Sequence, residues 1–271
     1  MERKIKKFLL FGLFVAFSFS LKGNEEIQFS IITIGPYESE LYSAFGHSGI
    51  RYLDKKNKID HFYNYGIFDF NQPNFYVNFL NGKLLYMVAK YDYKTAEQFY
   101  VSQNRYIKEQ VLILTAAEKI LLYNLLEQNI KPENRTYLYN YVYNNCATKI
   151  RDVLSVVYGE NLEFISKSEN KSFRELMDLY LNNNRWGDLG IDICLGPEID
   201  YKVSFNEEMF LPEYLFKGVE EASLSGKNKI VSLTNTINNN SIDFESHFFN
   251  PFLVFFSFLI LSISFSFRQI K

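Results

Sequence analysis

The chain has 271 residues, with 29 Lys and Arg against 31 Asp and Glu, and its formal net charge is −2. Hydrophobic residues make up 47% of it, which excludes a disordered chain, and the absence of a basic excess argues against nucleic-acid binding. Two Cys cannot form a disulfide framework, and no pair of CxxC elements supplies a structural zinc site. We therefore expect an ordered chain without a metal or other cofactor.

The first 23 residues have the composition of a secretion signal. A basic start is followed by the apolar run Phe8–Leu21, which is short for a membrane span and typical of a signal-peptide core. Ser18 and Ser20 have the spacing of small residues that a signal peptidase requires. We predict a signal peptide over residues 1–23, with an uncleaved N-terminal anchor as the alternative, and both export the chain that follows.

The next stretch reads as strands and a hairpin. Gln28–Gly35 is β-branched and bounded by Gly-Pro, and the polar segment 54–58 separates two strand-like runs, 46–53 and 59–66. Further along, the pattern predicts alternating helices and strands, which are a helix from Pro73 to Gly82, a strand at 84–91, a helix at 94–104 and a strand at 106–114.

Helices dominate the second half. Thr115 and Glu118 form a capping box that opens a helix ending near Asn129. Residues 146–158 carry a helical apolar stripe closed by Gly159. We also expect short helices at 173–181 and 207–216, on either side of a stretch, 187–197, that contains Gly and Pro. The mixture predicts one α+β domain.

The C-terminal end resembles a membrane anchor. Residues 248–267 carry no charge and are long enough to cross a bilayer as a helix, and Arg268 and Lys271 follow directly. A buried core helix is the alternative. We predict a signal peptide or N-terminal anchor (1–23), an exported domain (24–231), an Asn- and Ser-rich tether (232–247), a transmembrane helix (248–267) and a cytoplasmic tail (268–271).

The charges follow this division. Five of the basic residues lie in residues 1–23 and two in 268–271, which leaves 22 basic against 30 acidic residues in 24–247, a net charge of −8. Such a domain is not drawn to anionic lipid by charge, so the anchor would have to supply the membrane contact.

Cys146 and His47 are the candidate catalytic pair. Asn145 is a good N-cap and places Cys146 in the first turn of a helix, where backbone N–H groups favour a thiolate and are suited to an oxyanion hole. We expect these groups to lower the pKa of the thiol. His47 lies in a strand between Gly46 and Gly49, small residues that allow a partner to approach closely. Two alternatives remain, namely buried structural roles for both residues and a disulfide between Cys146 and Cys194.

Three ordered blocks resemble a known family. FGHSGIRY (Phe45–Tyr52), YNYGIFDF (Tyr63–Phe70) and YVYNNCATKIRD (Tyr141–Asp152) are similar to signature blocks of the Lnb-type lipoprotein N-acyltransferases. The segments NRYIKEQVLILTAAEK (104–119) and MFLPEYL (Met209–Leu215) also resemble family segments in the same order.

The resemblance implies a circularly permuted papain-like (NlpC-type) domain with an antiparallel sheet, in which the His strand precedes the Cys helix. It also implies an enzyme at the inner membrane, with its catalytic domain on the periplasmic side. Cys146 would take an acyl chain from a membrane phospholipid as a thioester, with His47 as base, and pass it to the N-terminal amine of a diacylglyceryl lipoprotein. The implied partners are phospholipid and lipoproteins.

A third residue is expected to orient the base. In the predicted hairpin, Asn64, Tyr65 or Tyr63 could reach His47. Asn64 belongs to a block that resembles the family, and it would act as Asn does in papain-type sites; bonding to backbone at a strand end is its alternative role. His61 is the competing orienter. Asp69 and Arg151 also lie in matching blocks, where we expect structural roles, and Asp200 matches the acidic residue of a family-like Gly-Asp block.

Other functions fit the same residues. A papain-like fold also serves cysteine peptidases and amidases of peptidoglycan, because fold alone does not fix the chemistry. Water in place of the lipoprotein amine would make the protein a phospholipase. A non-enzymatic envelope protein that binds through its Tyr and Phe side chains is a third possibility, although a binding protein needs neither a base nor a thiol.

Overall fold

A computed structural model describes residues 26–37, 39–68, 73–74, 77–78, 81, 83, 85–240 and 250–269, with side chains as far as 267. The predicted signal peptide and half of the predicted helix from Pro73 to Gly82 lie outside these residues. Asp69 does as well.

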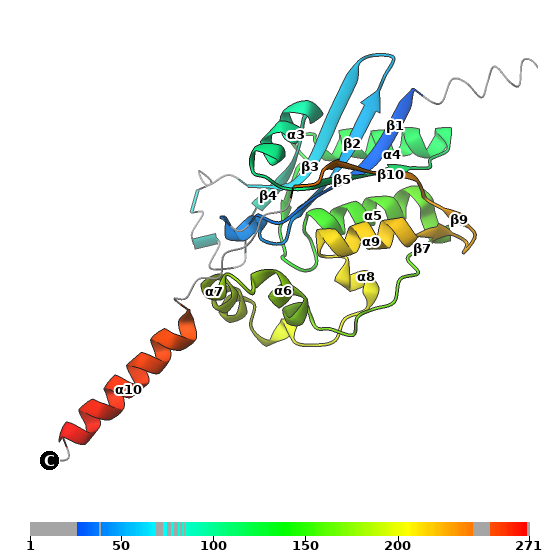
Figure 1. Ribbon diagram of the computed structural model, residues 1–271. Coiled ribbons are helices and arrows are strands. Elements are labelled where there is room, and N and C mark those ends of the chain that lie inside the picture. Colours follow the sequence, from blue (N-terminus) through cyan, green and yellow to red (C-terminus); the bar gives the residue numbers. More distant parts are fainter. Residues whose placement is uncertain are drawn as a thin grey trace, which may run out of the picture.

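A seven-stranded antiparallel sheet forms the centre of the protein (Figure 1). Its strands lie in the order β10-β5-β1-β2-β3-β4-β6. They are β1 (Ile27–Ile34), β2 (His47–Asp54), β3 (Ile59–Ile67), β4 (Leu85–Asp92), β5 (Ile107–Leu112), β6 (Thr136–Leu138) and β10 (Val231–Asn238). A small second sheet joins β7 (Leu162–Glu163), β8 (Ser223–Leu224) and β9 (Asn228–Lys229).

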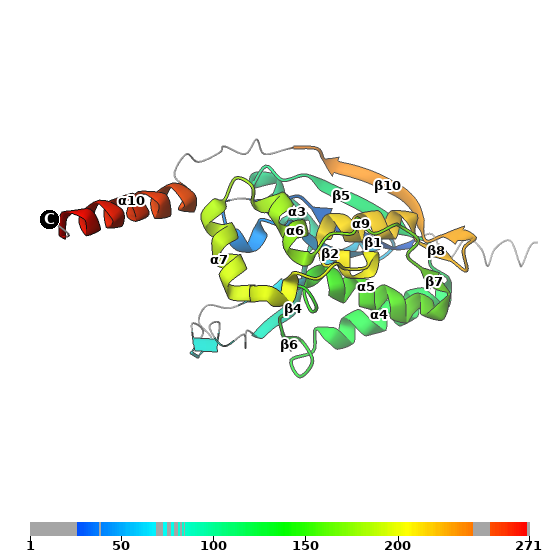
Figure 2. The same ribbon diagram turned by 90° about the horizontal axis from the view of Figure 1, so that it is seen from below.

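Helices cover both faces of the large sheet (Figures 1 and 2). On one face lie α5 (Cys146–Tyr158) and α9 (Pro212–Glu221), with α4 (Ala116–Asn129) packed beside α5. On the other face lies α3 (Tyr93–Ser102). Adjacent residues of β1 point to opposite faces, so Ile31 enters the larger core beneath α5 and Ile32 the smaller core beneath α3.

Further helices complete the folded domain before β10. They are α6 (Phe173–Leu181), α7 (Arg185–Leu195), α8 (Phe205–Glu208) and the single-turn helices η2 (Leu41–Ser43), η3 (Gly159–Asn161) and η4 (Gly196–Ile199). The Gly- and Pro-containing stretch 187–197, to which no element was assigned from sequence, lies mostly within helix α7. Asn184 caps this helix by accepting a hydrogen bond from Gly187 N, and Pro197 follows its C-terminal Gly196.

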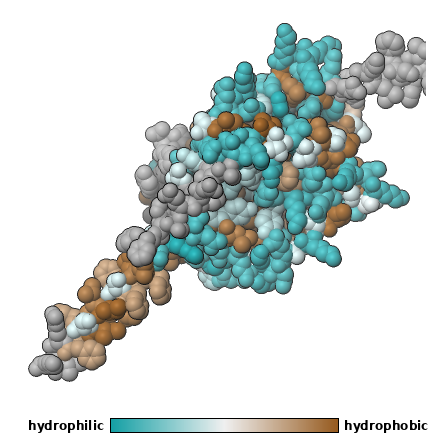
Figure 3. Space-filling view, in the orientation of Figure 1, coloured by the Kyte–Doolittle hydropathy of each residue, from teal (hydrophilic) through white to brown (hydrophobic). Residues whose placement is uncertain are grey.

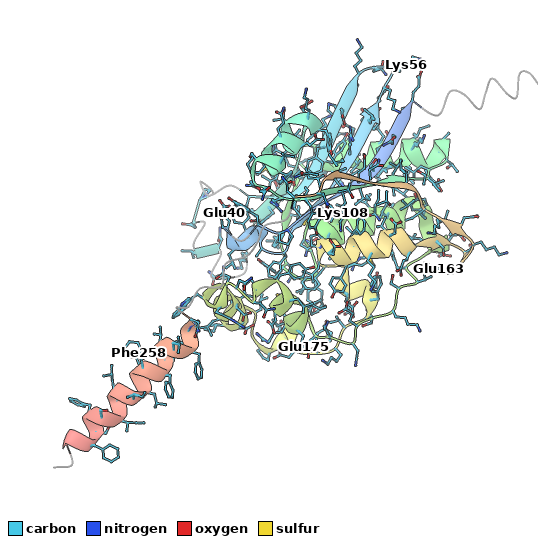
Figure 4. The ribbon with its side chains drawn as sticks, in the orientation of Figure 1. Glu40, Lys56, Lys108, Glu163, Glu175 and Phe258 are labelled. Atoms are coloured by element: carbon cyan, nitrogen blue, oxygen red, sulfur yellow. The ribbon has the colours of Figure 1, made fainter. Side chains whose placement is uncertain are left out.

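The β2–β3 hairpin fixes the position of the candidate site. Lys56 lies at the tip of the turn, as its label in Figure 4 shows. From there the register pairs Tyr52 with His61 and Gly49 with Asn64. His47 begins β2 at the opposite end of the hairpin, so the site lies where β2 starts and β3 ends.

The predicted tether was wrong at its start. Val231–Asn238 forms β10, which pairs with β5 at the edge of the sheet. The Asn and Ser content suggested a linker, but Val231, Leu233, Thr234, Thr236 and Ile237 give this segment the β-branched and apolar content of a strand. The folded domain therefore extends to Asn238 and does not end at residue 231.

The C-terminal helix α10 (Pro251–Gln269) projects from the domain beside α7. Much of its surface is apolar, with paler patches between the brown ones (Figure 3), and Phe258, labelled on this helix in Figure 4, is exposed. The ring of Phe255 lies 6.4 Å from that of Trp186 on α7. We predicted a transmembrane helix at 248–267; among the described residues, no helix has both the length and the apolarity that crossing a bilayer requires.

The α+β fold and its antiparallel sheet agree with the sequence prediction. The permuted papain-like relationship stays a prediction.

Candidate active site

Cys146 is the first residue of α5, as the sequence predicted, because Asn145 caps the helix. The Asn145 Oδ1 accepts hydrogen bonds from Ala147 N at 2.9 Å and Thr148 N at 3.0 Å. Its Nδ2 donates to the carbonyl oxygens of Tyr141 and Phe210, at 2.7 and 2.9 Å. One buried amide therefore joins the helix that carries the thiol to two other segments, and so fixes the position of the sulfur.

The base and its partner come from neighbouring strands. The Nε2 of His47 lies 2.6 Å from the Oδ1 of Asn64. Asn64 pairs with Gly49, so its side chain shares a face of the sheet with His47 and lies diagonally across from it. The Nδ2 of Asn64 donates to the hydroxyl of Tyr100 on α3, at 3.5 Å. This second contact assigns the amide orientation and makes Asn64 the acceptor toward His47.

The competing orienters point elsewhere. Tyr63 donates its hydroxyl proton to Glu127 at 2.5 Å, and Tyr65 accepts a hydrogen bond from Asn129 at 2.9 Å. Both tyrosines therefore contact helix α4 and not His47. His61 pairs with Tyr52 closer to the turn and does not line the cavity that contains His47. Of the candidates named from sequence, Asn64 is the one that contacts the base.

Cys146, His47 and Asn64 line one cavity of about 370 Å³. The volume falls within the range usual for small-molecule sites. Its wall is rich in aromatic rings, which are Tyr42, Phe45, Phe68, Tyr86, Phe99, Tyr100, Tyr139, Tyr141 and Phe210. The rings of Tyr86 and Tyr139 stack with their centroids 4.0 Å apart. A wall of this kind is suited to an apolar ligand.

Burial sets the protonation of the pair. Burial, and to a smaller extent the nearby Arg105 charge, lower the pKa of His47 to about 4, although the hydrogen bond to Asn64 acts in the opposite direction. The imidazole is therefore neutral at pH 7. With Nε2–H donating to Asn64, Nδ1 is left as the basic nitrogen.

The expected fall in the pKa of the Cys146 thiol was wrong. Burial raises this pKa, and it outweighs the backbone N–H groups of Ser48, Ala147 and Cys146 itself, which act in the opposite direction. The helix N-terminus is visible in the sequence, whereas the depth of the sulfur, which belongs to a residue only 9% exposed, depends on the tertiary fold. The resting pair is a neutral thiol and a neutral imidazole.

The glycines beside His47 have structural roles. A Cβ on Gly49 would lie 2.2 Å from the Phe62 ring, so this position leaves room for a core side chain and not for a ligand. Gly46 has a φ of +82°, which favours glycine at the entry to β2.

Arg105 is a residue of the cavity that the sequence argument did not select. It is 3% exposed and follows α3, where its Nε donates to the Gly35 carbonyl at 2.6 Å. It lies within the family-like segment 104–119, but a single Arg at a helix–strand junction has no spacing that would mark it as part of a site.

The other polar residues named from sequence have structural contacts. Arg151 pairs with Asp152 at 2.8 Å and donates to the Asn206 carbonyl, and Asp200 accepts from Arg174 at 2.6 Å. Both cysteines are free thiols, and Cys194 is exposed whereas Cys146 is buried.

The carboxylates of Asp178, Asp188 and Asp192 lie within 4.8 Å of one another on α6 and α7, outside the cavity. Arg174 forms an ion pair with Asp192, so part of this negative charge is already neutralised. We assign no metal to these three residues.

A family model described as the Lnb N-terminal periplasmic domain matches residues 24–178, more than half of the chain. The matched region contains the three blocks on which the resemblance rested, with His47, Asn64 and Cys146 among them, whereas Met209–Leu215 lies beyond it. No curated protein matches the chain, and no solved structure matches it.

Proposed function

The chain belongs to the Lnb family, and from that premise we propose that it transfers an acyl chain from a membrane phospholipid to the N-terminal amine of a lipoprotein, through a thioester on Cys146. The matched region is a periplasmic domain, which places this family on the periplasmic side of the cell envelope. Cys146 is the nucleophile of the proposal, His47 the base, and Asn64 the residue that orients the base.

One observation carries the proposal. The 2.6 Å contact between His47 Nε2 and Asn64 Oδ1 holds a neutral imidazole in the wall of the cavity that also contains the Cys146 thiol. A thiol, a base and an orienting amide are the elements of nucleophilic catalysis by cysteine. Their order along the chain, with the His strand before the Cys helix, supports the permuted papain-like reading.

The first half-reaction forms the thioester. Nδ1 of His47 takes the thiol proton while the sulfur attacks an ester carbonyl of the phospholipid. Backbone N–H groups near Cys146, those of Ser48 and Ala147, are candidates to stabilise the oxyanion. The tetrahedral intermediate collapses as His47 gives its proton to the leaving alkoxide, and a lysophospholipid is released.

The second half-reaction consumes the thioester. The free amine of the lipoprotein attacks the thioester carbonyl, His47 takes a proton from the attacking nitrogen, and the thiolate of Cys146 leaves and is protonated. The products are an amide and the original thiol. Water as the acceptor would give a fatty acid, so aromatic cover over the thioester favours transfer over hydrolysis.

Two surfaces support lipid substrates. The aromatic wall of the cavity is suited to an acyl chain, and α10 exposes a continuous set of Phe, Leu and Ile side chains. We propose that α10 holds the domain at the inner membrane, with the domain on the periplasmic side. Trp186 on α7, 42% exposed and beside Phe255, would then lie near the lipid interface, where Trp is favoured.

Mass spectrometry of lipoprotein N-termini tests the function. In a strain that lacks the gene, the wild-type chain should restore N-acylated lipoproteins and the Cys146→Ala variant should not. The Cys194→Ala variant removes the exposed thiol and serves as the matched control. Full N-acylation with Cys146→Ala would overturn the proposal. Altered muropeptides with unchanged lipoproteins would indicate a peptidoglycan peptidase or amidase instead, and release of fatty acid without acylated lipoprotein would indicate a phospholipase.

A further inference from the structure

Arg105 is a buried cation without a carboxylate partner among the described residues. It is 3% exposed, its Nε donates to the Gly35 carbonyl at 2.6 Å, and its Nη1 donates to Gln103 Oε1 at 3.2 Å. Its Nη2 has no hydrogen-bond partner in the part of the chain that the structure describes. Its hydrogen bonds go to neutral oxygens, and its guanidinium carbon lies 5.1 Å from the centroid of the Tyr100 ring, so no negative charge balances it among the described residues.

Arg51 and Arg174, by contrast, are neutralised by carboxylates. Arg51 lies between two carboxylates, at 2.7 Å from Asp60 and 3.1 Å from Glu109. Arg174 pairs with two aspartates. A buried charge without an opposite charge is costly, so a guanidinium of this kind is expected to meet an anion in the functional state.

The position of Arg105 limits what that anion is. Arg105 lines the same cavity as Cys146 and His47, and it is the only Lys, Arg, Asp or Glu among the described residues of the cavity wall. The nearby charge also acts on both groups, lowering the pKa of His47 and opposing the rise in that of Cys146. A ligand that reaches the thiol therefore enters the field of a single positive charge.

The two proposed substrates differ in charge close to the reacting atoms. The lipoprotein brings an amine, which a nearby guanidinium disfavours in its protonated form. The phospholipid brings a phosphate a few bonds from the ester that is cleaved, and Arg binds phosphate through paired N–H donors. The anion that fits is the phosphate of the acyl donor.

We propose that Arg105 binds the phosphate of the phospholipid donor and thereby directs its ester carbonyl toward Cys146. This inference rests on the proposed function for the identity of the donor. It gives the cavity a polar subsite for the headgroup side of the lipid and leaves the aromatic wall for the acyl chain.

Binding of short-chain lipids to the full-length Cys146→Ala protein in detergent tests this subsite without turnover. Isothermal titration would compare dihexanoyl phosphatidylglycerol with dihexanoylglycerol, which lacks the phosphate. The first should bind more tightly, and Arg105→Gln should weaken it about 10- to 100-fold, the usual effect of losing hydrogen bonds to a charged group, while leaving dihexanoylglycerol unchanged. Arg105→Lys should retain part of the preference, because it keeps the charge but not the paired donors.

Lys131→Gln is the matched control, since it removes one exposed positive charge on the surface outside the cavity. Thermal unfolding of each variant identifies loss of folding, and Arg105→Lys covers the case in which Arg105→Gln does not fold. Equal weakening of both lipids by Arg105→Gln, or no preference for the phosphate lipid in the parent protein, would overturn the proposal. Glycerol 3-phosphate binding as tightly as the lipid would assign the site to a free phosphate instead. A phosphate preference in a chain that transfers no acyl group would refute the proposed function but not the subsite.

Discussion

Nε2 of His47 and Oδ1 of Asn64 lie 2.6 Å apart, across the end of the β2–β3 hairpin. The contact selects one tautomer of the imidazole, with the proton on Nε2 and the lone pair on Nδ1. It also restricts rotation of the ring, because Asn64 is itself held by the Tyr100 hydroxyl. The hairpin register therefore determines which nitrogen of His47 acts as the base.

Replacing Asn64 with Ala should lower kcat for acyl transfer. The imidazole keeps its position in β2 but loses the acceptor that fixes its tautomer and orientation. We expect a loss of about 10- to 100-fold, a part of what a positioned general base usually contributes. The rate of transfer to a synthetic lipopeptide measures it.

The matched control is Asn129→Ala. Asn129 lies on α4 and donates a hydrogen bond to Tyr65 of the same hairpin, and neither residue lines the cavity. Its kcat should stay close to that of the wild type. Equal losses in the two variants would mean that Asn64 acts through the stability of the hairpin and not through His47.

Alkylation should distinguish the two thiols. Because burial raises the pKa of Cys146, little of it is thiolate at pH 7, and the thiolate is the reactive form. Cys194 is exposed to the reagent. Iodoacetamide at pH 7 should therefore modify Cys194 before Cys146, and peptide mass spectrometry of a time course measures both rates. Faster modification of Cys146 would instead indicate a preformed thiolate–imidazolium pair.

Much of the fold followed from local pattern. The β-branched run of β1 that ends before Gly-Pro, the polar turn at 54–58 and the capping box of Thr115 with Glu118 each identified an element that the structure contains. The same is true of Asn145 as the cap of α5. These signals depend on hydrogen bonds and side-chain contacts within a few residues, so they can be read without knowledge of the tertiary structure.

The sequence predictions were wrong or incomplete for features that depend on tertiary contacts. β10 is a strand because β5 offers a free edge, a condition that composition does not record. The pKa of Cys146 depends on how deeply the sulfur is buried, and the position of Arg105 in the cavity depends on packing between α3 and β5. Local sequence indicated which groups carry the chemistry, whereas their protonation and charge environment required the three-dimensional structure.

The stability of the protein should fall as the pH drops from about 6.5 to about 4, in part because of His47. Its pKa is about 4 in the folded state, whereas an unperturbed His has a pKa of about 6.5, so between these values the unfolded chain binds more protons. The free energy of unfolding therefore rises with pH across this window. Urea denaturation of the wild type and of His47→Gln at a series of pH values measures it.

Comparing the wild type with His47→Gln isolates the contribution of His47, because the other titratable groups are present in both proteins. Asp188, for example, has a pKa raised to about 6 by burial and by the neighbouring carboxylates, and it contributes equally to both curves. The difference in unfolding free energy between wild type and His47→Gln should shrink from pH 6.5 to pH 4 and stay constant above and below that range. A difference that does not change with pH would mean that the folded-state pKa of His47 is not lowered.

Asn145→Ala should be among the more destabilising single changes at the site. The variant loses the N-cap of α5, which costs about 1 kcal/mol, and leaves the buried carbonyls of Tyr141 and Phe210 without their donor. We expect a loss of about 2–4 kcal/mol in the free energy of unfolding. Chemical denaturation measures it, and Ser172→Ala on α6, a cap without such long-range contacts among the described residues, should cost only about 1 kcal/mol.

Asn145→Asp separates the two contributions. The carboxylate still accepts from Ala147 N and Thr148 N, but it cannot donate to the carbonyls of Tyr141 and Phe210. If the hydrogen bonds from Asn145 to the Tyr141 and Phe210 carbonyls stabilise the site, Asp should be nearly as destabilising as Ala, although it is a good cap. If only capping matters, Asp should be as stable as the wild type, and the position of Cys146 would then be set by α5 alone.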